Sequence, residues 1–401
     1  MKKILISKKE DLKMNYVTTE NFEKFKNEIK NFVENEFEPI WYKVEIEAEI
    51  PEKIIARMRE LGLFGMPIPK KYGGLGLSTL EENMIYEELS RTNGCLRSRI
   101  GTSNGIGSMG ILFDGTEEQK NTYLPKIASG EWVSAFALTE PDAGSDAANI
   151  RTSAVLEGDY WILNGTKQFI TNANYAQVLT TIAVTDEIKR AHGGVTAFIV
   201  EKGMPGLSIG PADVKMGLKG SHTHEVVFSN CKVPKENVIG GQSMVGSGFK
   251  TAMRVLDKGR LCMGACALGA SQKMMELCID NINQKMDNGV SGERLQADQF
   301  ALADMATRIH AARQMLYHAS VMRDQGKNVT HEASMIKVFC TEMASQIASQ
   351  AMDIFGAEGL LTKNKIEMFL RDVRLHRIYE GTSEIQRIII SRKLLNRKKK
   401  K

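Results

Sequence analysis

With 401 residues, the chain is too long for one hydrophobic core, so two or three domains are expected. Its composition, 42% hydrophobic and 25% charged, is that of a globular protein and excludes a fibrous or disordered class. The net charge of +5 equals the charge of the last five residues, Arg397 to Lys401, so no basic face for nucleic acid is predicted.

No stretch of the sequence is as long and apolar as a membrane-spanning helix requires, so no membrane partner is predicted. Residues 1–14 are rich in lysine and lack the apolar run of a signal peptide, so a cytoplasmic location is expected. The six cysteines are scattered without a Cys-x-x-Cys pair, which indicates reduced thiols and predicts no metal site.

After the extension at 1–14, residues 15–131 follow a helical pattern. Thr19 is placed to cap a helix whose apolar residues recur from 22 to 33 at helical spacing. Pro51 opens a second helix, and Gly62 closes it. A glycine-rich turn at 71–78 leads to a helix over 79–92, and Thr116 caps a further helix that begins with acidic residues.

Residues 132–240 change to short runs typical of strands, separated by Gly, Asn, Pro and Asp. The predicted strands are 132–138, 160–163, 178–184, 196–200 and 225–228. This spacing indicates an antiparallel β-barrel or sandwich.

The helical pattern resumes over 241–396 and precedes a basic tail at 397–401. Four long segments rich in Ala and Met, 250–287, 296–325, 330–355 and 365–397, predict an antiparallel four-helix bundle. The expected fold is therefore α+β and multidomain, with helices first, a β-domain next and a helical bundle last.

Glu380 stands between an aromatic residue and Gly381, in a stretch that separates two helical patterns. A glycine frees the backbone there, so the carboxylate can project into a cavity whose apolar wall raises its pKa toward that of a general base. Taken alone, a loop carboxylate that caps the next helix is the more common explanation.

Three further segments carry candidate polar groups. The turn at 138–146 presents hydroxyl and backbone N–H groups to an anion or a polar ring, although it also fits an ordinary turn. The segment 161–172 contains an Asn-Gly hairpin signal followed by Phe169 and Thr171. Asp257 and Arg260 are three residues apart on one helix face, where a surface ion pair is the simplest interpretation.

Together and in this order, the four segments and the helical, β and helical architecture resemble the acyl-CoA dehydrogenase family over residues 20 to 395, nearest to its short-chain members. The resemblance implies that Glu380 removes the α-proton of an acyl thioester while the β-hydrogen leaves as hydride to N5 of FAD. Some members of the family carry their base at the helix position that corresponds to Gly259, directly before Arg260. Because this chain has glycine there, Glu380 is the only candidate for the base.

The resemblance also assigns contacts to both ligands. The expected cofactor-binding residues are Phe136, Leu138, Thr139, Gly144, Ser145, Phe169, Ile170, Thr171, Gln299, Thr382 and Glu384. The expected substrate-binding residues are Ser145, Asp257, Arg260, Tyr379 and Gly381.

Two stretches depart from the family pattern where a neighbouring subunit usually completes the FAD site. An Arg-x-x-Phe-Gly stretch is replaced by Asn288-Gly289-Val290-Ser291-Gly292, which lacks both the arginine and the aromatic residue. A Gln-Ile-x-Gly-Gly-x-Gly stretch reads Asp353-Ile354-Phe355-Gly356-Ala357-Glu358-Gly359, which adds two acids near the expected diphosphate. We therefore expect FAD to bind less tightly than is usual in the family.

The expected function is dehydrogenation of an acyl-CoA to the trans-2-enoyl thioester, in fatty acid metabolism, with an electron-transferring flavoprotein as the electron acceptor. One alternative keeps this chemistry on an acyl or aminoacyl group carried by an acyl carrier protein. Another is a non-enzymatic member of the family. By the same resemblance the protein is expected to form a homo-oligomer, a tetramer or a dimer.

Overall fold

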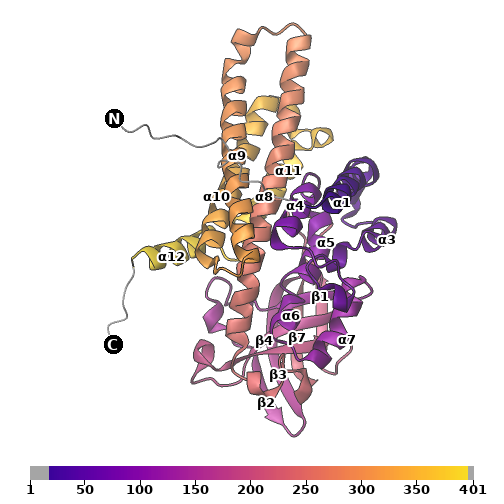
Figure 1. Ribbon diagram of the computed structural model, residues 1–401, viewed down its shortest axis with the longest axis vertical. Coiled ribbons are helices and arrows are strands. Elements are labelled where there is room, and N and C mark those ends of the chain that lie inside the picture. The colour runs from indigo at the N-terminus through magenta and orange to yellow at the C-terminus, as the bar shows by residue number, and fades with distance from the viewer. Residues whose placement is uncertain (1–17, 396–401) are drawn as a thin grey trace, which may run out of the picture.

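The computed structural model describes residues 18–395, so the expected N-terminal extension at 1–14 and the basic tail at 397–401 lie outside the described residues. The C-terminal helices form a long bundle that reaches the top of the view, the N-terminal helices lie beside it, and the β-domain lies at the bottom (Figure 1). The three parts follow the predicted order of helices, β-domain and helical bundle.

The N-terminal helices begin at the predicted caps. The Thr19 and Thr116 hydroxyls accept hydrogen bonds from N–H groups of the first turns of α1 and α7, and Gly62 ends α3 with a positive φ of 68°. The first helix runs into a π-helical turn at Phe32–Phe37. The helices are α1 (Glu20–Asn31), α2 (Trp41–Glu47), α3 (Glu52–Glu60), α4 (Thr79–Leu89), α5 (Cys95–Asn104), α6 (Met109–Asp114) and α7 (Glu117–Ala128).

The β-domain is one curled sheet with the order β1-β4-β2-β3-β7-β6, and β5 pairs with β4 off this path. Its strands are β1 (Val133–Ala137), β2 (Ser153–Glu157), β3 (Tyr160–Thr171), β4 (Ala176–Val184), β5 (Val195–Glu201), β6 (Leu207–Ala212) and β7 (Thr223–Pro234). The extended pairings are antiparallel, as predicted, apart from β1 with β4, which run parallel. This parallel pair corrects the expectation of a wholly antiparallel domain, because β1 enters the sheet from the helical part rather than through a hairpin.

The C-terminal part consists of α8 (Gly248–Asp287), α9 (Gln296–Asp324), α10 (Thr330–Phe355), α11 (Ile366–His376) and α12 (Ser383–Leu394). The predicted fourth segment is thus two helices, separated by the loop that carries Glu380. Helix α12 projects sideways from the bundle, and the ends of α8 and α9 extend away from the β-domain (Figure 1).

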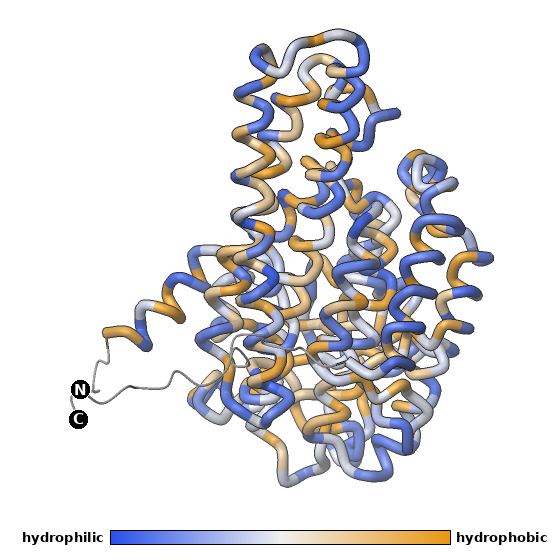
Figure 2. The backbone as a smooth tube through the Cα atoms, turned by 45° about the horizontal axis from the view of Figure 1, so that its top comes forward, coloured by the Kyte–Doolittle hydropathy of each residue, from blue (hydrophilic) through white to orange (hydrophobic). Residues whose placement is uncertain are grey.

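The largest hydrophobic core joins the two helical parts, because α4 packs its apolar residues against α8 and α9. In the hydropathy view, apolar stretches gather where the helices meet and polar stretches turn outward (Figure 2). All six cysteines are unpaired and buried. Within residues 18–395, no helix has the length and apolarity needed to cross a lipid bilayer. The site described next lies where α5, α8, α10 and the α11–α12 loop converge.

Candidate active site

Glu380 lies in the short loop between α11 and α12, in an unusual backbone conformation. Its φ is +58°, in the left-handed region that L-residues other than glycine rarely adopt, and Gly381 follows with a φ of +90°. Thr382 then caps α12 by accepting a hydrogen bond from the Ile385 N–H. The turn therefore directs the Glu380 side chain inward, toward α8, instead of along the surface.

Two buried side chains hold this loop in place. The Lys337 Nζ on α10 donates to the Gly381 carbonyl at 2.8 Å, and the Gln386 Nε2 donates to the same oxygen at 3.1 Å. Lys337 has no solvent exposure, and this burial lowers its pKa to about 8. A buried ammonium thus stands beside the candidate base without forming an ion pair with it.

The Glu380 carboxylate lies directly over Gly259 of α8. A Cβ at position 259 would overlap Oε2 and lie 2.7 Å from Cδ. Oε2 is buried and has no hydrogen-bond partner among the described residues. Burial raises the pKa of Glu380 above its ordinary value, and the positive charges of Arg97, Arg260 and Lys337 partly oppose this shift.

Asp257 and Arg260 form the predicted pair on either side of Gly259 in the sequence of α8. They make a close ion pair in which Arg260 is buried, and Asp257 also accepts a hydrogen bond from the Thr330 hydroxyl at 2.6 Å.

A groove of about 250 Å³ opens beside Asp257. Three basic side chains line it: Arg254, Arg323 and Lys327. This groove has the charge expected of a phosphate-binding surface.

In the β-domain, the two predicted flavin segments lie side by side. The Thr139 carbonyl accepts a hydrogen bond from the Gln168 N–H at 2.8 Å. The buried Lys167 ammonium donates to the Leu138 carbonyl at 3.0 Å and pairs with Glu140 at 2.7 Å. These hydrogen bonds hold the backbone of Leu138 and Thr139 in a fixed position.

An irregularity in the pairing of β3 with β7 turns Phe169 outward. Phe169 has a φ of +57° and is 59% exposed, although it is a large aromatic side chain. Phe136, Leu138 and Ile170 are buried, and Thr139 and Thr171 are half-buried beside them.

The loop at Gly144 leaves open space next to this surface. Gly144 and Ser145 are exposed, and a Cβ at Gly144 would meet no atom within 4 Å. An exposed aromatic ring, fixed backbone groups and a free glycine edge can together accept a flat, polar ring system.

The flavin segments are joined to the Glu380 side of the site through α5. Asn172 Nδ2, next to Thr171, donates to the carbonyls of Ser98 and Arg99 at 3.1 and 3.2 Å. On the same helix, Arg97 lies close enough to Glu380 to lower the carboxylate's pKa. Both groups of predicted residues are therefore connected to one helix, α5.

Gln299 does not join the other predicted cofactor residues within this chain. It is exposed near the start of α9, where its Nε2 donates to the Gly292 carbonyl at 3.3 Å. At a rise of 1.5 Å per residue, the end of α8 at Asn288 lies roughly 40 Å from Arg260. Both departures from the family pattern lie at this end, because Lys285 of α8 donates to the Ile354 carbonyl at 2.5 Å.

Three residues of the site were not predicted from the sequence: Arg97, Lys337 and His376. Arg97 is only 8% exposed and lies on α5. His376 is buried in the last turn of α11 and stacks on Tyr379 with ring centroids 5.8 Å apart. Burial lowers the pKa of His376 to about 3, so its ring is neutral. Neither the spacing nor the local context of these residues gives a signal, because their meeting depends on tertiary packing.

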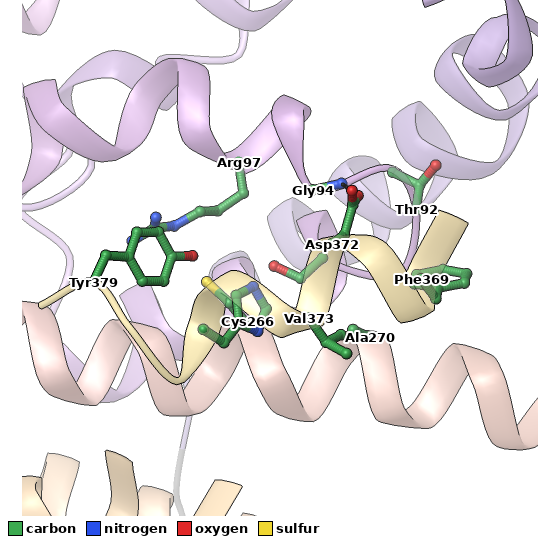
Figure 3. A pocket seen from close by; sticks show the side chains of 11 residues that line it. Thr92, Gly94, Arg97, Cys266, Ala270, Phe369, Asp372, Val373 and Tyr379 are labelled. Atoms are coloured by element: carbon green, nitrogen blue, oxygen red, sulfur yellow. Dashed lines mark hydrogen bonds between the residues drawn. The ribbon is translucent and has the colours of Figure 1, made fainter. Parts of the chain in front are cut away.

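Arg97, His376 and Tyr379 line an enclosed cavity together with Thr92 and Asp372 (Figure 3). It has about 10 Å³ of free volume, which is room for one oxygen-sized group. The Arg97 side chain reaches past the Tyr379 ring, whereas the Asp372 carboxylate points to Gly94 (Figure 3). The cavity thus lies in the helical core, next to Tyr379, the residue that precedes Glu380.

Comparison with known proteins gives matches along nearly the whole chain. Residues 19–131, 135–231 and 246–395 match the models of the N-terminal, middle and C-terminal domains of acyl-CoA dehydrogenase.

Individual relatives cover a similar share of the chain. An acyl-CoA dehydrogenase of Bacillus subtilis is 40% identical over 92% of this chain and 96% of its own. An acryloyl-CoA reductase (NADH) of Anaerotignum propionicum is 39% identical over 98% of this chain and 100% of its own. Among solved structures, butyryl-CoA dehydrogenase of Megasphaera elsdenii superposes with a TM-score of 0.90 at 33% identity, over 95% of this chain and 100% of that one.

Proposed function

Because the chain belongs to the acyl-CoA dehydrogenase family, we propose that it oxidises the Cα–Cβ bond of an acyl-CoA thioester, with Glu380 as the base that removes the α-proton. It is an oxidoreductase of a family that depends on FAD. The non-enzymatic alternative left open by the sequence is therefore set aside.

One observation carries the assignment of Glu380. Its Oε2 is buried, lacks any hydrogen-bond partner among residues 18–395, and faces the space over Gly259 instead of solvent. Leaving a carboxylate oxygen unsatisfied costs free energy, so an unpartnered oxygen in a dry site is typical of a group that meets its partner in the substrate. Burial also raises the pKa of Glu380 toward the range in which a carboxylate is an effective base.

The backbone of the same residue supplies a donor for the thioester oxygen. Negative charge develops on this oxygen as the α-proton leaves, and a fixed N–H group stabilises it. Within the described part of the chain, the Glu380 N–H meets no acceptor, whereas the neighbouring Tyr379 N–H is bonded to the Leu375 carbonyl. We propose that the free N–H binds the substrate carbonyl, so that one residue both removes the proton and holds the developing charge.

The β-domain residues fit the cofactor that the family requires. The exposed Phe169 ring, the fixed backbone of Leu138 and Thr139, and the open edge at Gly144 match a flat flavin with polar edges. Thr171 and Ser145 would add hydroxyl contacts from the same surface. When bound, FAD supplies the acceptor for the hydride that leaves the β-carbon.

The groove beside Asp257 supports CoA as the carrier of the acyl group. Arg254, Arg323 and Lys327 gather at its wall, and arginine and lysine are the side chains that best bind phosphate. Asp257 and Arg260 would then contact the pantetheine arm between the groove and Glu380. A carrier-protein thioester remains the alternative, because its phosphopantetheine arm would reach Glu380 in the same way.

The test is anaerobic bleaching of the FAD-loaded enzyme by a panel of acyl thioesters. We expect short acyl-CoAs to reduce the flavin, and Glu380→Gln to reduce the bleaching rate by about three orders of magnitude or more while substrate still binds. Bleaching only by carrier-bound thioesters would favour the alternative. A Glu380→Gln enzyme with wild-type rates would refute Glu380 as the base.

The remaining partners follow the family pattern. We propose that an electron-transferring flavoprotein reoxidises the reduced enzyme and that the protein forms a homo-oligomer. The position of Gln299 and the loop at Asn288, roughly 40 Å from Arg260, supports the second point, since that distance lets this end of the bundle serve only a neighbouring subunit's cofactor.

A further inference from the structure

Lys167 of β3 is a charged side chain with no solvent exposure. Its ammonium donates to the Leu138 carbonyl at 3.0 Å and pairs with the Glu140 carboxylate at 2.7 Å. Taking two charges out of water costs free energy, and well-packed apolar side chains often stabilise the same place equally well. The buried pair therefore points to a role other than stability.

The hydrogen bonds of the Glu140 carboxylate keep it ionised. Its Oε2 accepts from the Arg151 N–H at 2.5 Å, and its Oε1 accepts from the Thr152 N–H at 2.9 Å. Burial opposes ionisation, but Lys167 and these N–H groups outweigh it, so the pKa of Glu140 lies below its ordinary value. Burial lowers the pKa of Lys167 to about 8, so at pH 7 both members of the pair are charged.

Lys167 contacts the peptide group between Leu138 and Thr139, which belongs to the first proposed flavin segment. The carbonyl of this peptide accepts the hydrogen bond from Lys167. Its N–H, on Thr139, meets no acceptor among residues 18–395. The Gln168 N–H holds the Thr139 carbonyl at 2.8 Å, and Thr139 is only half-buried. The peptide thus offers a ligand one N–H donor in a fixed orientation.

The Lys167 ammonium makes this N–H a stronger donor. Hydrogen bonds along a chain polarise one another, by about 10–30% per bond, and an ammonium on the carbonyl draws electrons away from the N–H of the same peptide. The charge is also weakly screened, because Lys167 is buried. The Thr139 N–H therefore favours an acceptor that carries negative charge.

The proposed reaction gives the flavin such a charge. The hydride brings two electrons and one hydrogen from the β-carbon, while the α-proton goes to Glu380, so a neutral oxidised flavin ends with one negative charge. A group that binds the reduced form more tightly than the oxidised form raises the midpoint potential. For a two-electron couple, a tenfold difference between the two affinities corresponds to about 30 mV.

We propose that Lys167 raises the reduction potential of the bound flavin by acting through the Leu138–Thr139 peptide. This inference deepens the proposed function and rests on the flavin surface assigned there. Lys167 is a positioning residue, since it orients and polarises the donor and does not itself contact the substrate. Glu140 is the counter-charge that keeps the buried ammonium protonated.

The experiment measures the midpoint potential of the bound flavin by spectroelectrochemical titration at pH 7, without substrate. Lys167→Met removes the cation and leaves the Glu140 carboxylate without its counter-charge. We expect this variant to bind reduced flavin at least about tenfold more weakly relative to oxidised flavin, which is a shift of about 30 mV or more to negative potential.

The double variant Lys167→Met/Glu140→Gln separates charge from packing. It removes both charges, so the potential should recover part of the shift and stay below that of the wild type, because the Leu138 carbonyl still lacks its donor. A pair with a purely structural role predicts the reverse order, since the double variant changes more contacts than the single one. The double variant also buries no unpaired charge, so it still gives a test if Lys167→Met does not fold.

The matched control is Lys235→Met in the same domain. Lys235 directly follows β7 and pairs with Asp159, but both side chains are exposed, so water screens their charges. We expect the potential of this variant to equal that of the wild type. Thermal unfolding of each variant separates loss of folding from a change at the flavin.

Phe169→Ala tests the flavin surface separately. Phe169 is exposed, so its loss should leave the fold intact and weaken FAD binding. If FAD affinity is unchanged in this variant, the assigned surface fails, and the inference about Lys167 fails with it. If acyl thioesters are not oxidised, the proposed reaction fails, and the potentials still decide the role of Lys167.

Three results would overturn the inference while the flavin surface stands. In the first, folded Lys167→Met holoenzyme has the potential of the wild type. In the second, the double variant has a potential as low as that of Lys167→Met or lower. In the third, the double variant has the potential of the wild type, which would mean that the hydrogen bond to Leu138 has no effect.

Discussion

The carboxylate of Glu380 occupies the space that a side chain at Gly259 would need. The two residues are 121 positions apart in the sequence. The glycine at position 259 and the inward position of the Glu380 side chain explain each other. The glycine lets the α8 backbone approach the Glu380 carboxylate, and the carboxylate fills the space that the missing side chain leaves.

Gly259→Ala should therefore inactivate the enzyme without unfolding it. The added methyl would push the Glu380 carboxylate away by about 1 Å, and a displacement of this size lowers kcat by about 100-fold. In a Glu380→Ala background the clash is absent, so the same substitution should stabilise α8 by up to about 1 kcal/mol, as alanine does in a helix. Steady-state kinetics and thermal unfolding measure the two effects. Full activity in Gly259→Ala would show that the carboxylate does not need this space.

The acidic limb of the pH profile should respond to Lys337. As a base, Glu380 must be ionised, so kcat/KM falls as the pH drops through its pKa. The Lys337 charge lowers that pKa, and Lys337→Met removes the charge. The pKa of Glu380 then rises, and the acidic limb should move to higher pH.

Lys273→Met on α8 is the control for this variant, because Lys273 is half-exposed and remote from the loop. Its profile should match that of the wild type. An acidic limb of Lys337→Met that stays in place or moves to lower pH would contradict the assigned interaction.

His376→Phe should make the protein less sensitive to acid. In the folded state the pKa of His376 is about 3, compared with 6.5 for an ordinary histidine. Between these values the unfolded chain binds a proton that the folded chain does not, so this residue's contribution to stability is present above pH 6.5 and is lost as the pH falls toward 3. Phenylalanine keeps the stack on Tyr379 and removes the proton.

The measurement is the free energy of unfolding from denaturant titrations between pH 4 and 6.5. Its fall with decreasing pH should be shallower in His376→Phe by up to about 1.4 kcal/mol per pH unit. Asp372, whose pKa is raised to about 7, contributes the opposite slope in wild type and variant alike. Equal slopes for the two proteins would mean that His376 titrates normally.

FAD should dissociate from the purified protein on dilution and gel filtration. The loops at 288–292 and 353–359 lack an arginine and carry two acids where the family is expected to hold the diphosphate of a neighbouring subunit. Asn288→Arg combined with Asp353→Gln should tighten FAD binding by about tenfold or more, as measured by recovery of flavin fluorescence. Stoichiometric FAD that survives gel filtration in the wild type would refute this prediction.

The helical frame was largely predictable, because its signals are local. Thr19, Thr116 and Gly62 define helix ends through contacts within one turn of the chain. Within the β-domain, β2 and β6 were not predicted: β2 is a short strand with an exposed outer half, and β6 contains Gly210 and Pro211, which disfavour a strand in isolation.

Only some residues of the candidate site could be predicted from the sequence. Glu380 and the proposed flavin segments are carried by continuous stretches, so the prediction could rest on their order along the chain. Arg97, Lys337 and His376 reach the site from α5, α10 and α11, and each lies in an otherwise unremarkable helix. These side chains stand out because they are buried and because some polar atoms have hydrogen-bond partners and others have none. Only the packed structure shows this.

The left-handed backbone of Glu380 has a consequence for protein engineering. This conformation costs an ordinary L-residue about 1 kcal/mol, and glycine would adopt it freely. Selection for heat resistance alone would therefore favour Glu380→Gly, which relieves both the backbone and the buried charge. The most thermostable descendants of this chain would be those that had lost the base, so a screen for stability must be paired with a screen for turnover.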